Sequence, residues 1–214
     1  MHIDIWSDVV CPWCYIGKRR LEQALTQFAH RDSVEIRWHS FELDPSAPGA
    51  REGTYASRLA AKYGVPEEQA RQMLDEMTAR AAELGLTYDF SIAQHANTFD
   101  AHRVLHLAHE RGVQDAVEER LFRAMFTEGR ALGDAETLIS LAAEAGLEAD
   151  EVRAVLATDR YADAVRADEA QAVQLGVTGV PFFVIDRRYG VAGAQPADVL
   201  LRVLDGAWAQ RAAA

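Results

Sequence analysis

The spacing of polar and apolar residues predicts a strand, a helix and a second strand at the start of the chain. Residues 2–6 and 34–38 alternate between polar and apolar side chains, which is typical of half-buried strands. Between them, residues 15–28 carry apolar side chains at helical spacing. A strand, a helix and a strand in this order favour a βαβ unit with parallel strands and a right-handed crossover.

A different pattern begins after residues 44–49, which are rich in turn-forming residues. From about residue 54 to residue 175, nearly every segment has the periodicity of a helix. Glycines are expected to end these helices. Three of the helices have expected N-terminal caps, which are Asn97-Thr98, Asp134, and Thr158 or Asp159. The predicted helices cover residues 55–63, 66–84, 97–111, 117–125, 135–145, 151–157, and a last segment from 158 or 159 to 175.

Strand patterns return after Gly176. Residues 182–185 form an apolar run, as in a strand that is covered on both faces, and residues 189–192 form a second short strand. Together they predict a β-hairpin. A last helix begins at Pro196 and carries an apolar face that is suited to packing on the sheet.

The order of these elements predicts an α/β fold in two parts. Residues 1–44 and 159–214 are expected to form one discontinuous domain, and residues 45–158 an all-helical insertion. The chain has 214 residues, of which 49% are hydrophobic and 26% charged, so it is long enough to bury a substantial core and has an ordinary globular balance.

The charge and the N-terminus narrow the choice of partners and compartment. The formal net charge of −11 argues against a nucleic acid or an anionic membrane as the main partner. No apolar run reaches the length of a transmembrane helix, and the N-terminus enters a strand without the features of a secretory signal. We therefore expect a cytoplasmic protein.

The candidate chemistry lies in Cys11-Pro12-Trp13-Cys14, which holds both cysteines of the chain. Pro12 suits the first turn of a helix, so Cys11 is expected at the N-cap, directly after the first strand. There the unpaired N–H groups and the positive end of the helix dipole favour a thiolate, which is the nucleophilic form of cysteine. Cys14 follows one helical turn later, within reach for a disulfide. We interpret the pair as a redox dithiol, in which one thiol attacks and the other resolves.

Two other interpretations of the cysteine pair are a zinc site and a static disulfide. A zinc site with two cysteines would need two histidines, and His102 and His106 stand four residues apart on a predicted helix. Pro12 at a helix start favours the redox pair over a metal site, so no bound metal is expected. The absence of further cysteines fits a reducing compartment.

The second candidate element is Val180-Pro181, directly before the apolar run. Proline lacks a donor for the hydrogen-bond ladder of a sheet, so its place before a buried strand is unusual. A cis peptide bond would leave the backbone of Val180 facing the dithiol and able to pair with an extended substrate. A trans proline at the start of an edge strand explains the pattern equally well.

The whole chain resembles the thioredoxin fold as elaborated in the DsbA family, and within it the FrnE-like oxidoreductases. The likeness rests on residues 7–17 (SDVVCPWCYIG), 97–103 (NTFDAHR), 179–185 (GVPFFVI) and 189–195 (YGVAGAQ). The resemblance implies that Cys11 attacks, that Cys14 resolves and that a cis Pro181 lies opposite them. Pro12, Trp13 and Val180 are then the expected substrate contacts.

The same resemblance implies the reaction and its partners. Thiol–disulfide exchange or disulfide isomerisation is expected, on a protein or small-molecule thiol or disulfide, with a separate redox partner. No tightly bound cofactor is expected beyond the redox-active disulfide itself, while glutathione as a co-substrate and a homodimer stay open. The Pro-Trp dipeptide lacks the histidine of the strongly oxidising periplasmic enzymes, so a role as the main periplasmic oxidant is not expected.

Two alternative functions remain. The fold with its helical insertion is also similar to 2-hydroxychromene-2-carboxylate isomerase and to kappa-class glutathione transferases, in which a serine commonly takes the place of Cys11. For such a glutathione-dependent enzyme, Asn97, Thr98 and His102 are candidates beside the cleft, although helix capping also explains Asn97 and Thr98. The other alternative is a chaperone or adaptor that binds peptides on the methionine-bearing helix over residues 66–84.

Overall fold

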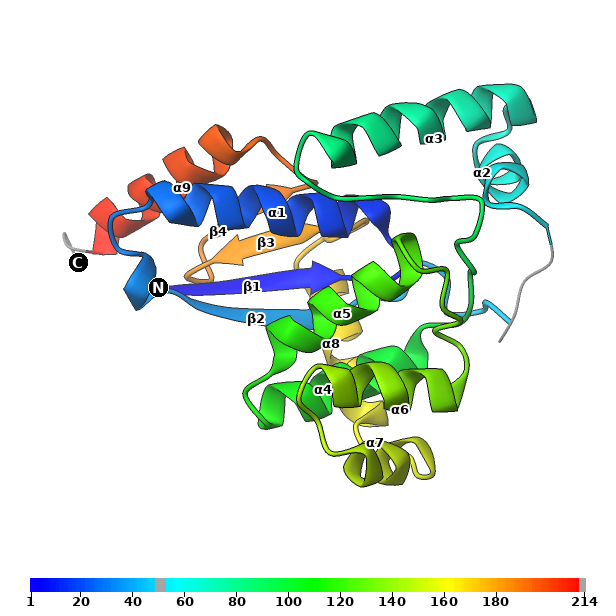
Figure 1. Ribbon diagram of the computed structural model, residues 1–214. Helices are drawn as coiled ribbons and strands as arrows, with labels where there is room; N and C mark the ends of the chain where they lie inside the picture. The colour runs from blue at the N-terminus through cyan, green and yellow to red at the C-terminus, as the bar shows by residue number, and fades with distance from the viewer. Residues whose placement is uncertain (49–52, 212–214) are drawn as a thin grey trace. The chain divides into compact units, whose positions relative to one another are not determined.

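The computed structural model describes residues 1–48 and 53–211 (Figure 1). These residues form four strands, nine α-helices and one 3₁₀ turn. Contacts within the chain divide it into two compact units, which we call unit 1 (Met1–Leu43 with Arg160–Ala214) and unit 2 (Asp44–Asp159). In the described ranges, no helix combines the length and the apolar character needed to span a membrane.

Unit 1 is built on a mixed sheet with the strand order β2-β1-β3-β4. β1 (His2–Ser7) runs parallel to β2 (Glu35–Ser40), and α1 (Pro12–Gln27) lies between them in the chain, as the sequence pattern predicts. β3 (Phe182–Ile185) pairs antiparallel with β1 and with β4 (Tyr189–Ala192), so the predicted hairpin is confirmed. β3 is therefore an inner strand, which explains its continuous apolar sequence.

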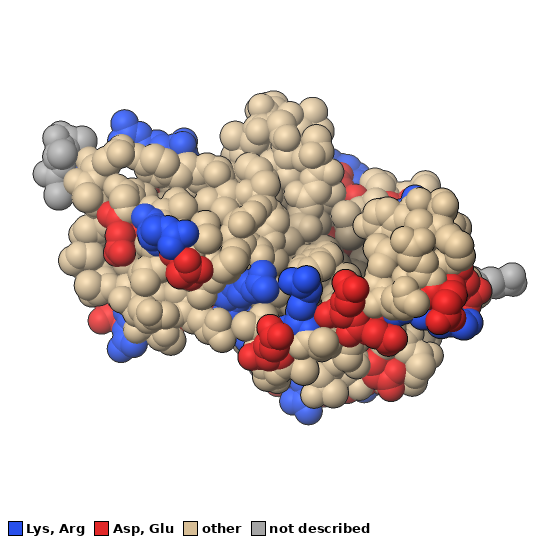
Figure 2. Space-filling model, turned by 90° about the horizontal axis from the view of Figure 1, so that it is seen from above, with Lys and Arg blue, Asp and Glu red and all other residues tan. Residues whose placement is uncertain are grey.

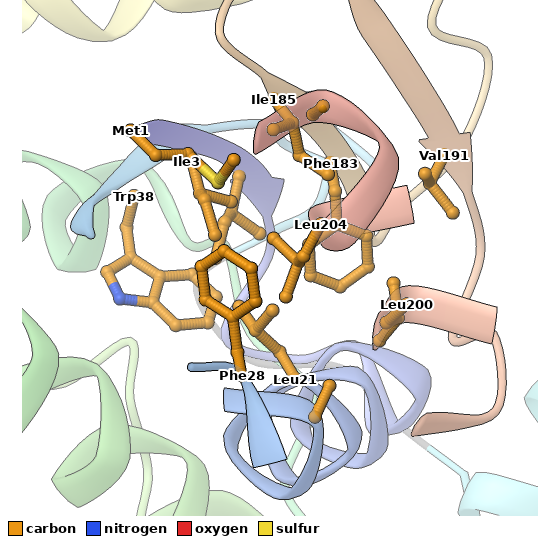
Figure 3. Close-up of a cluster of buried hydrophobic side chains, with 13 residues drawn as sticks. Met1, Ile3, Leu21, Phe28, Trp38, Phe183, Ile185, Val191, Leu200 and Leu204 are labelled. Atoms are coloured by element: carbon orange, nitrogen blue, oxygen red, sulfur yellow. The ribbon is translucent and has the colours of Figure 1, made fainter. Parts of the chain in front are cut away.

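One face of this sheet carries the main hydrophobic core of unit 1. Successive side chains of a strand point to opposite faces, and Ile3 and Ile5 of β1 face the same side as Phe183 of β3. α1 and α9 (Ala197–Arg211) cover this face (Figure 1). Their contributions to the cluster include Leu21, Phe28, Leu200 and Leu204 (Figure 3). Each large apolar side chain stabilises the fold by about 1.5–3 kcal/mol when fully buried.

The opposite face of the sheet packs on α8 (Ala162–Gln174). Trp6 of β1 lies here with Val184 of β3 and Ala172 of α8. The indole N–H of Trp6 donates a hydrogen bond to the backbone carbonyl of Asp168, at 3.0 Å. Helices therefore cover both faces of the sheet in unit 1.

A buried histidine joins three elements on the α8 face. His39 of β2 stacks on the ring of Trp6, with the centroids 4.5 Å apart. Its two ring nitrogens each lie 2.8 Å from a carboxylate oxygen, one of Asp4 in β1 and one of Asp168 in α8. The second oxygen of Asp168 accepts the backbone N–H of Ser40. We call Asp4, His39 and Asp168 the His39 triad.

The described part of unit 2 contains six helices. Their bounds are α2 (Tyr55–Tyr63), α3 (Glu67–Ala82), α4 (Phe99–Glu110), α5 (Gln114–Phe126), α6 (Ala135–Glu144) and α7 (Ala149–Leu156). Side-chain caps begin α2 and α6, because Thr54 accepts the N–H of Ser57 and Asp134 accepts the N–H of Thr137. Gly64 ends α2 in the left-handed conformation, with φ of 65°, as predicted.

The structure differs from the predicted helix start before residue 175. Thr158 and Asp159 do not cap α8, which begins only at Ala162 after Tyr161. The hydroxyl of Thr158 donates instead to the carbonyl of Ala154 at the end of α7. Tyr161 has a φ of 65°, and this left-handed residue redirects the chain before α8 starts. The predicted turn at residues 44–49 is described as far as Pro48, and Gly49 lies outside the described residues.

Candidate active site

Cys11 and Cys14 lie where the first strand gives way to the first helix. Cys11 is the N-cap residue of α1, with extended backbone angles, and Pro12 occupies the first helical position. The N–H of Cys11 donates to the carbonyl of Asp8 at 2.9 Å, and the N–H of Cys14 donates to the carbonyl of Cys11 at 3.0 Å. This backbone arrangement confirms the predicted placement of Cys11 at the N-cap of α1.

The two thiols are free and differ in their surroundings. Cys11 is 5% exposed, whereas Cys14 is completely buried. Burial raises the pKa of the Cys14 thiol well above its usual range, and the adjacent Cys11 raises it further. The backbone N–H of Asp8 and the hydroxyl of Ser7 also face this sulfur, and each of them lowers the pKa of Cys14 in part. Cys14 is therefore a protonated, inaccessible thiol at neutral pH, which makes it a poor first nucleophile.

The peptide before Pro181 faces Cys11 from the start of β3. The Val180–Pro181 bond is cis, which decides the question that the sequence pattern left open. The Cys11 thiol donates a hydrogen bond to the carbonyl of Val180, with 3.5 Å between sulfur and oxygen. The carbonyl of Pro181 accepts the N–H of Gly193 at 2.8 Å, which ties the residue after β4 to this turn. The cysteine pair and the cis-proline turn, predicted as separate elements, thus meet at one end of the sheet.

Asp8 has a structural role beside this site. It is buried, and its carboxylate accepts the backbone N–H of Leu43 at 2.8 Å and that of Val10 at 3.4 Å. These hydrogen bonds hold the turn that leads from β1 into α1.

Sequence reasoning did not identify Ser7 as a neighbour of Cys14, although both belong to the segment that carries the family resemblance.

The remaining predicted site residues are placed as follows. Pro12 is buried and Trp13 and Val180 are half-buried, all in unit 1. Asn97 and Thr98 belong to unit 2. The side-chain oxygen of Asn97 accepts the N–H of Phe99, and its amide donates to the carbonyls of Pro45 and Ala47. Asn97 therefore orders the start of α4, while the roles of Asn97 and Thr98 in substrate binding stay predictions.

The zinc-site alternative involves residues of different units. His102 and His106 lie on α4 of unit 2, and the cysteines lie in unit 1. Within the described residues, no three side chains of histidine, cysteine, aspartate or glutamate are arranged to hold a metal ion. The chemistry that the described geometry offers at the cysteine pair is that of two neighbouring thiols.

Comparison with known proteins places this arrangement in a family. The chain is 28% identical over 208 residues to the uncharacterised protein YwbO of Bacillus subtilis, which covers 95% of this chain and 96% of that protein. It is 52% identical to a crystal structure described as a probable DsbA oxidoreductase from Streptomyces coelicolor, with a TM-score of 0.93 over 98% of this chain and 90% of that chain.

A more distant structure has the same fold. The cytosolic disulfide reductase DsbM of Pseudomonas aeruginosa, solved with glutathione, is 20% identical, with a TM-score of 0.64 over 96% of this chain and 98% of that chain. The model of the DSBA-like thioredoxin domain matches residues 2–205. The predicted fold class is thereby confirmed as a thioredoxin fold with a helical insertion, and this chain belongs to the DsbA-like thioredoxin family.

Proposed function

We propose that this protein is a thiol–disulfide oxidoreductase that works through Cys11 and Cys14. The observation that carries the proposal is the placement of two free thiols one helical turn apart at the N-terminus of α1, with the carbonyl before a cis proline in contact with the first. Membership of the DsbA-like family and the 52% identity to a structure described as a probable DsbA oxidoreductase support it.

The two cysteines take different roles in this reaction. Cys11 attacks, because it lies at the N-terminal end of α1 and is 5% exposed, whereas Cys14 is completely buried. Its sulfur forms a bond to one sulfur of the substrate disulfide, and the other substrate sulfur leaves as a thiolate and takes up a proton. A mixed disulfide between Cys11 and the substrate results.

Cys14 completes the exchange. It loses its proton and attacks the Cys11 sulfur of the mixed disulfide, so that the second substrate sulfur leaves as a thiol and a Cys11–Cys14 disulfide forms. Two electrons pass from the dithiol to the substrate, and the reverse sequence oxidises a dithiol substrate. Because Cys14 is buried and its pKa is raised, this second step depends on the local groups that face its sulfur, Ser7 and Asp8.

The proposed substrates are extended peptides or small molecules that carry a thiol or disulfide. The proposed contacts are Pro12 and Trp13, which stand between the two cysteines in the chain, and Val180, whose carbonyl contacts Cys11. On the face that Figure 2 shows, basic side chains lie next to acidic ones, and the net charge is −11, so a nucleic-acid substrate has no support. Glutathione as a co-substrate, a redox partner in the cytoplasm and a homodimer belong to the same proposal.

Single cysteine variants test the assignment. Cys11→Ser is expected to lower the rate of insulin reduction by dithiothreitol to the uncatalysed rate, because no attacking thiol remains in the protein. Cys14→Ser is expected to accumulate mixed disulfides that a thiol releases, because the first step proceeds and the second does not. Full activity in both variants would refute the proposal. Turnover of a glutathione-dependent isomerase substrate that survives the Cys14→Ser change would favour the isomerase alternative instead.

A further inference from the structure

Gly17 lies at the closest approach between α1 and the cis-proline turn. It is a buried residue in the second turn of the helix that Cys11 caps. A Cβ atom built on Gly17 would lie 2.8 Å from Cγ of Pro181, 3.4 Å from its Cβ and 3.3 Å from Cζ of Phe183. Carbon atoms in ordinary contact stay about 3.5–4.0 Å apart. Any side chain at residue 17 would therefore have to move Pro181 by roughly 0.7 Å or more.

The neighbours of Gly17 cannot move aside on their own. The atoms that a Cβ would meet first belong to the ring of Pro181, which is fixed to its own backbone. Phe183 is 1% exposed and belongs to the core cluster of unit 1 (Figure 3). A change of ring pucker moves Cγ of Pro181 but leaves its Cβ and Cζ of Phe183 in place, so full relief needs a shift of the backbone at the start of β3, or of α1.

A second glycine in a helix shows that this contact is particular to residue 17. Gly206 lies within α9, and a Cβ built on it has no heavy atom within 4 Å. Both glycines weaken the helix that contains them, because glycine is a poor helix former. The surrounding structure leaves no room for a side chain at Gly17, whereas it leaves room at Gly206. A glycine-to-alanine change at Gly206 is therefore the control for the same change at Gly17.

The contact at Gly17 bears on the reactive sulfur. α1 carries Cys11 and Gly17 on one rigid helix, and the turn at β3 carries Val180 and Pro181. The ring of Pro181 rests against Gly17, and the carbonyl of Val180 lies 3.5 Å from the Cys11 sulfur. A shift of Pro181 away from α1 would carry the Val180 carbonyl with it, because the two residues share a peptide bond.

We propose that Gly17 is a positioning residue of the dithiol site, which sets the distance between Cys11 and the Val180 backbone through its contact with Pro181. This inference rests on the proposed function for its effect on rate, because the substrate is expected to react at Cys11 while its backbone pairs with that of Val180. A displacement of about 1 Å in such a site can lower the rate by about 100-fold.

The test compares Gly17→Ala with Gly206→Ala in two assays. One assay measures kcat/KM for the reduction of a peptide disulfide, which requires both Cys11 and the Val180 backbone. The other measures the rate at which iodoacetamide alkylates Cys11, which requires no docking on Val180. Gly17→Ala is expected to lower kcat/KM by about 10- to 100-fold without lowering the alkylation rate of Cys11. Gly206→Ala is expected to change neither.

Equal kcat/KM in the two variants would overturn the inference, as would a parallel loss of alkylation in Gly17→Ala. A crystal structure of Gly17→Ala provides a measurement that does not depend on catalysis. The distance between the Cys11 sulfur and the Val180 carbonyl oxygen is expected to exceed 3.5 Å in this variant, and an unchanged distance would contradict the inference. If the wild type exchanges no disulfides, the proposed function fails, and this distance still decides whether Gly17 positions the Val180 backbone.

Discussion

Replacing His39 by leucine is expected to destabilise unit 1 by removing a buried cation that two carboxylates share. Both ring nitrogens of His39 lie 2.8 Å from carboxylate oxygens, and a neutral imidazole can donate only one hydrogen bond. The arrangement is therefore satisfied best by the doubly protonated ring. Leucine leaves Asp4 and Asp168 facing an apolar side chain.

The magnitude follows from the burial of the three partners. Removing one member of a buried ion pair costs about 3–5 kcal/mol. Asp168 keeps its hydrogen bond from Ser40, and the Asp4 side chain is 21% exposed, so water can solvate part of its charge. We therefore expect a loss at the lower end, about 3 kcal/mol. In a chain of this size that corresponds to a fall in Tm of roughly 6–12 °C.

The pH dependence of this effect has a definite sign. Burial alone would lower the pKa of His39, but the hydrogen bonds with Asp168 and Asp4 outweigh it, so the pKa is raised above 6.5. The hydrogen bond from His39 lowers the pKa of Asp4 below 3.8. Stabilisation by His39 is complete below pH 6.5 and is lost as the pH rises through the raised pKa. Stabilisation by Asp4 is complete above pH 3.8 and is lost as the pH falls through the lowered pKa.

Thermal unfolding of wild type and His39→Leu across this range checks the reasoning. The difference in Tm is expected to be largest between about pH 4 and pH 6.5 and to decrease at higher pH. His2→Leu is the matched control, because His2 pairs with Glu35 at 2.9 Å across the same two strands but is exposed to solvent. It should leave the Tm nearly unchanged. A His39→Leu protein with wild-type Tm at pH 5, or a difference that does not vary with pH, would refute the role assigned to the triad.

Three further predictions concern the thiols and unit 2. Native protein at pH 7.5 should take up one iodoacetamide adduct, on Cys11, and a second only after denaturation. Cys14 resists alkylation in the native state because it is buried and its pKa is raised. Mass spectrometry counts the adducts, and two adducts on the native protein would contradict this prediction. Arg103→Met should destabilise unit 2 by about 3 kcal/mol. The buried guanidinium of Arg103 pairs with Asp100 and donates to the carbonyls of Val155 and Thr158 near the end of α7. Chemical denaturation measures the loss of stability, and a midpoint equal to that of the wild type would contradict this prediction. Thr54→Ala should cost about 1 kcal/mol and speed amide exchange in α2, whereas Thr54→Ser, which keeps the hydroxyl that accepts from Ser57, should not.

Local patterns were sufficient to predict most elements of unit 1. The strands at Phe182–Ile185 and Tyr189–Ala192 have the predicted bounds, because an apolar run and a tight connection are encoded in neighbouring residues. The N-cap position of Cys11 follows in the same way from Pro12. The start of α8 did not follow, because Tyr161 adopts a left-handed conformation that few residues other than glycine take, and nothing in its sequence neighbourhood indicates it.

Features that depend on distant residues were predicted only in part. The cis bond at Pro181 was expected through family resemblance, whereas its contact with Cys11 depends on the sheet order that places β3 beside β1. The His39 triad joins residues that are 35 and 129 positions apart, and no local pattern pairs them. Gly17 left a partial signal, because glycine inside a predicted helix often indicates close packing, but the sequence does not name Pro181 as the neighbour.

Equilibration of the protein with mixtures of reduced and oxidised glutathione, followed by acid quenching and mass spectrometry, tests the central claim most directly. The account predicts a single reversible two-electron transition in which one intramolecular disulfide, mapped to Cys11 and Cys14, replaces two thiols. It also predicts that Cys14→Ser yields a glutathione adduct on Cys11 under the same conditions. A wild-type protein that forms no intramolecular disulfide at any glutathione ratio would contradict the redox assignment.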